Sequence, residues 1–252
     1  MSSFEISLLV FLCLVAGFFL GRWLQYRLPN HHLSKESQDT IKLGAGMVAT
    51  MSALILGLLV SSAKSSFDTV NISIAQNGAR IIQLDQLLAE YGPEAKACRD
   101  QLKASVAERV AKVWGKSSST SGLRAVEKST AMLDLQASLR RLTPQTDLQK
   151  SLLNQSLQIN ADIWQSRLLT FEEQQEPLPT VFLVLLVFWL AMLFMSFGLF
   201  APRNVTVSAV QLICAFSVSS AVFLILEMSH PLDGLIRVSN APMLKALELI
   251  GH

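Results

Sequence analysis

An uncharged stretch of about 21 residues, Leu43–Ala63, constrains this chain more than any other segment. An α-helix of that length crosses the hydrocarbon core of a membrane, which takes about 20 apolar residues. The stretch is also rich in glycine, alanine, serine and threonine. Lipid-facing helices do not need such residues, whereas close helix packing and wet cavities do. We therefore expect an inner helix of a bundle, which either packs against its neighbours or lines a pore.

The composition is that of an integral membrane protein. Of the 252 residues, 51% are hydrophobic and only 16% are charged, and the mean hydropathy is +0.40. The net charge of +2 gives no reason to expect a nucleic-acid partner. No strand-like alternation recurs along the chain, so the sequence predicts an all-α protein.

Four segments are expected to span the membrane, at about residues 4–21, 43–63, 180–200 and 205–226. A signal peptide would carry a basic residue before the first apolar run, and none is present here, so we expect the first span to be retained. The connection Ala201–Asn204 is so short that the third and fourth spans should form an antiparallel hairpin.

Beyond Ala63 the helical pattern continues to about Tyr91, so the second membrane helix should extend well past the bilayer. Its apolar residues recur at helical spacing: Phe67, Val70, Ile74, Ile81, Leu84 and Leu88. Gly92-Pro93 then breaks the helix. Three further helices are predicted, one ending at Trp114, one at Arg124–Leu142 and one from Thr143-Pro144 to about Glu176.

The expected fold is an all-α integral membrane protein in which a helical extramembrane domain is inserted between the second and third of four transmembrane helices. The first transmembrane hairpin takes residues 1–63 and the helical domain takes residues 64–179. The second hairpin takes residues 180–228, and an amphipathic C-terminal tail takes residues 229–252.

Charge leaves the side of the helical domain open. The short connectors between spans carry Arg22, Arg27, Lys35, Lys42 and Arg203, and the short ends on the opposite face carry Arg237 and Lys245. The positive-inside rule then favours cytoplasmic connectors and an external domain. However, Lys64 and Arg167 also lie near membrane ends on the domain face, so the bias is small.

Four runs of this sequence resemble the bestrophin-like family of bacterial membrane proteins, a family of unknown function. The runs are KLGAGMVATMSALILGLLVSSAKSSFD from Lys42, LLAEYGPEA from Leu87, FGLFAPRN from Phe197 and FLILEMSHPLDGLIRVSNAP from Phe223. The resemblance extends more weakly to bestrophins proper, which are homopentameric anion channels with four membrane helices per subunit and a helical domain between the second and third. It implies a pore lined by the second span and a cytosolic domain, which opposes the charge count. Calcium activation is not implied, because no acidic cluster resembles the calcium clasp of animal bestrophins.

The sequence gives little support to an enzyme. It contains no nucleotide-binding loop, no nucleophile–base motif and no metal-ligand spacing. The adjacent residues His31 and His32 would point apart on a helix, so they predict a loop rather than a metal site. We expect no cofactor and no metal.

The leading hypothesis is a homo-oligomeric ion channel lined by the second span. Hydroxyl groups would offer dipoles to a partly dehydrated anion, a lysine would concentrate anions at the mouth, and large apolar residues would form a constriction. The candidates are the hydroxyl residues Thr50, Ser52, Ser61 and Ser62, the cation Lys64, and the apolar residues Met51, Leu54 and Leu58. Alternatively, the small residues only allow tight packing within one subunit, and the lysine snorkels to headgroups or pairs with Asp68.

Charged residues near the ends of the later spans form a second group of candidates. Glu227 ends a long apolar run, and His230 follows three residues later, so the two could form a proton-sensitive pair. A position at the membrane interface explains both residues equally well. Asp233 lies close by in sequence, and Arg203 is expected to anchor the turn between the third and fourth spans.

Two other classes of function compete with the channel. A non-conducting scaffold or signalling protein would bind a partner through the helical domain, and a secondary transporter would need intramembrane charges or broken helices in two related halves. The expected location is the bacterial plasma (inner) membrane, crossed several times. The expected partners are the lipid bilayer, copies of the chain itself (five by analogy with bestrophins) and inorganic anions.

Overall fold

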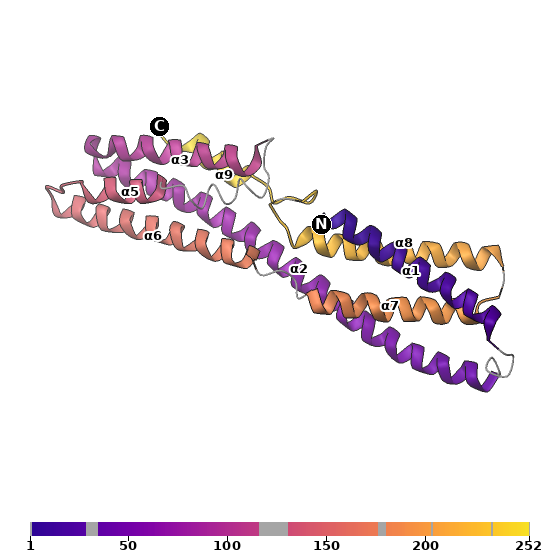
Figure 1. Cartoon of the computed structure of the whole chain (residues 1–252). Helices are drawn as coiled ribbons and strands as arrows, with labels where there is room; N and C mark the ends of the chain where they lie inside the picture. Colours follow the sequence, from indigo (N-terminus) through magenta and orange to yellow (C-terminus); the bar gives the residue numbers. More distant parts are fainter. Residues whose placement is uncertain are drawn as a thin grey trace. The chain divides into compact units, whose positions relative to one another are not determined.

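The computed structural model describes residues 2–28, 35–115, 131–175, 180–202, 204–232 and 234–251. The regular secondary structure in these ranges is entirely helical, so the predicted all-α class is confirmed (Figure 1). The elements are α1 (Ser3–Arg27), α2 (Lys35–Tyr91), the 3₁₀ turn η2 (Pro93–Ala95), α3 (Lys96–Trp114), α5 (Ala131–Arg140), α6 (Asp147–Gln175), α7 (Thr180–Phe200), α8 (Val205–Met228) and α9 (Ala241–Leu249).

Four of the described helices are long and apolar enough to cross a membrane: α1, α2, α7 and α8. They coincide with the four segments that the sequence predicts to be spans. The chain divides into two compact units, which are described one at a time. The first comprises Met1–Ser65 and Pro177–Ser229, and the second comprises Ser66–Glu176 and His230–His252.

In the first unit, α1 packs against α7 and α8 (Figure 1). Glycines bring α1 and α7 together closely: a Cβ atom at Gly17 would lie 2.8 Å from the carbonyl oxygen of Ala191, and one at Gly198 would collide with the carbonyl oxygen of Phe18. The Ser219 hydroxyl on α8 donates a hydrogen bond to the carbonyl oxygen of Ser7, which satisfies a buried polar group. Small residues therefore do set helix packing in this unit, chiefly between α1 and α7.

In the second unit, the apolar stripe that the sequence predicts along α2 lies in the core. Val70, Ile81 and Leu84 are fully buried, as are the other stripe residues except Phe67, which packs against the core from a partly buried position. The helix ends at Tyr91, as predicted. Gly92 has a φ of 124°, a conformation that L side chains rarely adopt, and η2 then leads into α3.

One predicted helix start differs from the structure, and another falls outside the described residues. The last long helix of the second unit begins at Asp147 rather than at Thr143-Pro144, because the side chain of Thr146 caps it by accepting a hydrogen bond from the Gln149 N–H at 3.1 Å. The prediction that Thr143 caps this helix is therefore wrong, because Thr146 is the capping residue. The predicted helix at 124–142 is seen as α5, and residues 124–130 are outside the described residues.

The C-terminal segment, which we expected to be a separate tail, belongs to the core of the second unit. Met243, Ala246 and Ile250 are buried there. The approach to α2 is close, since a Cβ atom at Gly78 would lie 2.9 Å from the carbonyl oxygen of Pro242. The buried side of α9 is therefore part of the packed core of the second unit.

Candidate functional site

The membrane segment of α2 has two different faces in the first unit. On one face Ser52, Leu59 and Ala63 are buried against the other helices. On the opposite face Leu54 is 61% exposed and Leu58 is 62% exposed. An 18-residue apolar window of α2 is only 11% buried, against 33% for α1 and 28% for each of α7 and α8. The second span is therefore the one that its own chain covers least.

Seven of the eight residues that the sequence offers as pore-lining candidates lie on the exposed face of α2: Thr50, Met51, Leu54, Leu58, Ser61, Ser62 and Lys64. At about 100° per residue they occupy an arc of about 160°, so they form one continuous stripe. Ser52 does not join them, because it is only 3% exposed and its hydroxyl donates to the carbonyl oxygen of Val48 at 2.8 Å. The structure thus sorts the hydroxyl residues of this span into an inner and an outer set.

Three glycines in the membrane segment of α2 are not used for packing within the chain. A Cβ atom added at Gly44, Gly46 or Gly57 would meet nothing within 4 Å. In contrast, a Cβ atom at Gly21 on α1 would collide with α7. Tight packing inside one subunit accounts for Ala45, Ala49 and Ser52, but it does not account for these three glycines of α2.

A pocket of about 490 Å³ lies in the first unit between the start of α2, the end of α7 and the start of α8. Its walls are mostly apolar, and Lys42 is the charged residue that lines it. The other lining residues include Ala49, Leu193, Phe197 and Gln211. Two of the runs that carry the family resemblance, those from Lys42 and from Phe197, therefore meet at this pocket.

The charged candidates near the ends of the later spans differ in burial and in the unit to which they belong. Glu227 is 6% exposed near the end of α8 and belongs to the first unit. His230 is exposed and begins the C-terminal segment of the second unit. Arg203 and Asp233 lie outside the described residues, so their predicted roles stay predictions.

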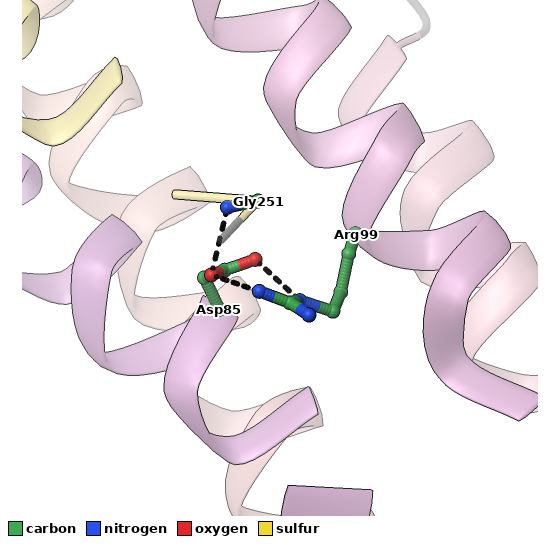
Figure 2. A network of polar contacts seen from close by, with 3 residues as sticks. All are labelled: Asp85, Arg99 and Gly251. Carbon is green, nitrogen blue, oxygen red and sulfur yellow. Dashed lines mark hydrogen bonds and ion pairs between the residues drawn. The ribbon is translucent and has the colours of Figure 1, made fainter. Parts of the chain in front are cut away.

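A polar network in the second unit was missed by sequence reasoning (Figure 2). Arg99 on α3 donates from Nε and Nη2 to the two carboxylate oxygens of Asp85 on α2, at 2.8 Å each. The N–H of Gly251 donates to Asp85 Oδ2 at 3.1 Å. Burial would raise the pKa of Asp85, but the hydrogen bonds from Arg99 and Gly251 and the positive charges of Arg99 and Lys103 outweigh it and lower the pKa below 3.8.

The signal for this network was a charged residue inside an apolar stripe. Asp85 lies between Ile81 and Leu88, which are buried at helical spacing on the same face of α2. A carboxylate at such a position must be paired or hydrogen-bonded, because burying an unpaired charge is costly. The sequence therefore could have indicated a buried pair, although it could not have named Arg99 or Gly251 as the partners.

Within the described part of the chain, no group of three or more His, Cys, Asp or Glu side chains is arranged to hold a metal ion. Cys13, Cys98 and Cys214 form no disulfide there. The geometry in these ranges thus offers a helical membrane unit with an uncovered second span and a helical unit with buried polar contacts.

Comparison with known proteins agrees with this architecture. A structure of a bacterial bestrophin homologue from Klebsiella pneumoniae with a Trp-to-Ala mutation matches 99% of this chain and 97% of its own, with a TM-score of 0.67 at 14% sequence identity. Another structure of the Klebsiella pneumoniae homologue, with an Asp-to-Ala mutation, matches 100% of both chains, with a TM-score of 0.65 at 15% identity. At such identities the likeness establishes a shared fold. No curated protein matches the sequence significantly.

The model of one protein family matches nearly the whole chain. It describes the bestrophin-like domain and covers residues 12–243, which include all four apolar helices in large part and the helical unit between α2 and α7. The resemblance carried by the four sequence runs is thus confirmed, and this chain belongs to the bestrophin-like family.

Proposed function

We propose that this protein is a homo-oligomeric membrane ion channel, permeable to anions, whose pore is lined by the exposed face of α2. The observation that carries the proposal is the combination of low coverage and small residues on this helix. Gly44, Gly46 and Gly57 point to open space in the single chain, and α2 is the least buried of the four spans. A surface of this kind suits contact with other copies or with water better than contact with lipid.

The residues on this face supply two zones along the helix axis. Met47, Met51, Leu54 and Leu58 are each more than half exposed and extend over about 16 Å, at about 1.5 Å per residue. A ring of such side chains would make an apolar constriction that gates by dewetting. Ser61, Ser62 and Lys64 follow within the next two turns and would form a polar mouth.

Anion preference follows from the charge of that mouth. Leu43–Ala63 contains no acidic residue, and Lys64 is the first charged residue after it. In an oligomer each subunit would add one ammonium group at the same level, which raises the local concentration of anions. The bestrophin analogy supports five subunits and a cytosolic helical unit in the bacterial plasma membrane, and we give it more weight than the small charge bias between connectors.

The test is ion efflux from liposomes that contain the purified protein, together with its mass in detergent. Leu58→Ser should raise chloride efflux by making the constriction wettable, since it replaces an apolar side chain on the pore face. The matched control is Leu224→Ser on α8, where a leucine is 48% exposed on a different helix. Equal effects of the two substitutions would refute the pore assignment. A folded monomer without flux would favour the competing scaffold, which binds a partner through its helical unit.

A further inference from the structure

Two arginines of the second unit have guanidinium groups buried without an acceptor. Both residues are partly exposed overall, yet Nε and Nη1 of Arg109 on α3 and Nε and Nη2 of Arg167 on α6 are buried and have no hydrogen-bond partner. A buried guanidinium normally faces a carboxylate, because desolvating a charge is costly unless it is paired. Neither arginine has an ion pair with any acidic side chain that the structure describes, a set that leaves out Glu172 and Glu173.

The two groups also repel each other. Burial lowers the pKa of Arg109 to about 10. Burial also lowers the pKa of Arg167 well below its usual value, and the positive charge of Arg109 lowers it further. The positive charge of Arg109 therefore acts on Arg167, and no described carboxylate offsets either shift.

The geometry of the donors indicates which kind of negative charge fits. Arg167 leaves Nε and Nη2 unpaired. These are the same two atoms through which Arg99 holds both carboxylate oxygens of Asp85, at 2.8 Å each. This edge of a guanidinium group matches two adjacent oxygen atoms of a carboxylate or phosphate. Near Arg167 on α6, the partly buried hydroxyls of Ser166 and Thr170 are satisfied within the protein by Ser73, at 2.9 Å each.

We propose that Arg109 and Arg167 form a buried binding site in the second unit for a small oxyanion such as inorganic phosphate or sulfate. Arg167 grips two oxygens of the anion side-on, and Arg109 donates to the remaining oxygens and neutralises the excess charge. The site belongs to the second unit, whereas the proposed pore face of α2 belongs to the first, and it does not depend on whether the protein conducts ions. It makes the stability of the helical unit responsive to the anions around it.

The test is thermal unfolding of the purified full chain in detergent with sodium phosphate, sodium sulfate or sodium chloride at matched ionic strength. Phosphate or sulfate should raise the Tm by several degrees relative to chloride, because a ligand that binds only the folded state stabilises it. Titration calorimetry with inorganic phosphate should give a Kd at least about tenfold weaker for Arg167→Gln, through loss of the bidentate contact. Arg140→Gln, which changes an exposed arginine on α5, is the matched control and should bind like the unsubstituted protein.

The outcomes are distinct. Arg167→Gln should fold well in chloride, because it removes one of two repelling buried charges, and it should lose the phosphate effect. Arg167→Lys keeps the charge without the side-on edge, and it should bind phosphate weakly. An unsubstituted protein that is equally stable in all three salts overturns the proposal, as would happen if a carboxylate of the chain already paired the arginines. A phosphate effect that survives in Arg167→Gln and in Arg109→Gln also overturns it.

Discussion

Replacing Asp85 with Asn should destabilise the second unit by about 2–3 kcal/mol. Asp85 has a side chain only 6% exposed, and Arg99 opposite it is 19% exposed. Removing one partner of a buried ion pair typically costs about 3–5 kcal/mol, because the other charge stays buried and unpaired. We expect the lower figure because asparagine keeps the volume and one acceptor oxygen, and because Arg99 retains some contact with water.

The same substitution should loosen the C-terminal segment, since Asp85 also accepts the N–H of Gly251 at 3.1 Å. Hydrogen exchange read by mass spectrometry reports this locally: amides of residues 241–251 should exchange faster in Asp85→Asn. Glu108→Gln is the control, because it breaks an exposed ion pair with Lys112 on one helix and should cost less than about 0.5 kcal/mol. Equal losses in the two variants, or unchanged exchange at residues 241–251, would refute the reasoning.

The pH dependence of this contact follows from the lowered pKa of Asp85. A carboxyl group with a folded-state pKa below 3.8 stabilises the folded protein at all pH values above its unfolded pKa. That contribution is lost as the pH falls from the unfolded pKa through the lower folded pKa, because the unfolded chain binds a proton at Asp85 before the folded protein does. The exchange of residues 241–251 should therefore show an acid-induced rise in the unsubstituted protein that Asp85→Asn lacks, once intrinsic rates are corrected for pH.

Three further predictions concern the membrane unit and its orientation. Gly198→Ala should lower the Tm of the protein, because the new methyl group collides with the backbone of Phe18. Gly57→Ala should leave the Tm nearly unchanged, because nothing lies within 4 Å of the added methyl group. Similar Tm shifts for both variants would contradict the packing described. Lys64→Gln should reduce chloride efflux from liposomes. The reduction should be smaller at about 1 M salt, where charges are screened beyond about 3 Å. An unchanged efflux at low salt would show that this lysine does not act on the ion pathway. Ser151→Cys, made in a protein whose native cysteines are replaced by serine, places a thiol at an exposed position on α6. A membrane-impermeant maleimide should label this thiol only in permeabilised cells. Labelling in intact cells would show that the helical unit is outside the cell.

Periodicity was enough to predict the helices, and local rules failed only at particular ends. The spacing of apolar residues along α2 identified its core face, and Gly92-Pro93 identified its end at Tyr91. The start of α6 was misplaced because Thr143 and Thr146 both satisfy the same capping rule. The structure chooses Thr146, whose hydroxyl meets the Gln149 N–H. Such a choice depends on how the preceding turn is held, which no local pattern states.

Sequence could not tell which small residues pack inside the chain. Gly21 and Gly57 both lie in apolar spans, yet only Gly21 touches a neighbouring helix. Likewise, the sequence did not predict that the guanidinium groups of Arg109 and Arg167 are buried, although both residues continue the helical spacing of core residues on α3 and α6. Pairing between residues on different helices depends on how the helices cross, and one chain without aligned relatives carries no record of that.

The Asp85–Gly251 contact also sets an order of events during synthesis. The core that residues 66–176 contribute to also contains buried side chains of α9, such as Met243 and Ala246. The Asp85 carboxylate accepts a hydrogen bond from the N–H of Gly251. A ribosome that has made residues 66–176 has not yet supplied those groups, and it must first produce α7 and α8. The core of the helical unit therefore stays incomplete until both later membrane helices have been translated. A nascent chain stalled before residue 241 would leave the core side chains that α9 covers exposed to chaperones and proteases.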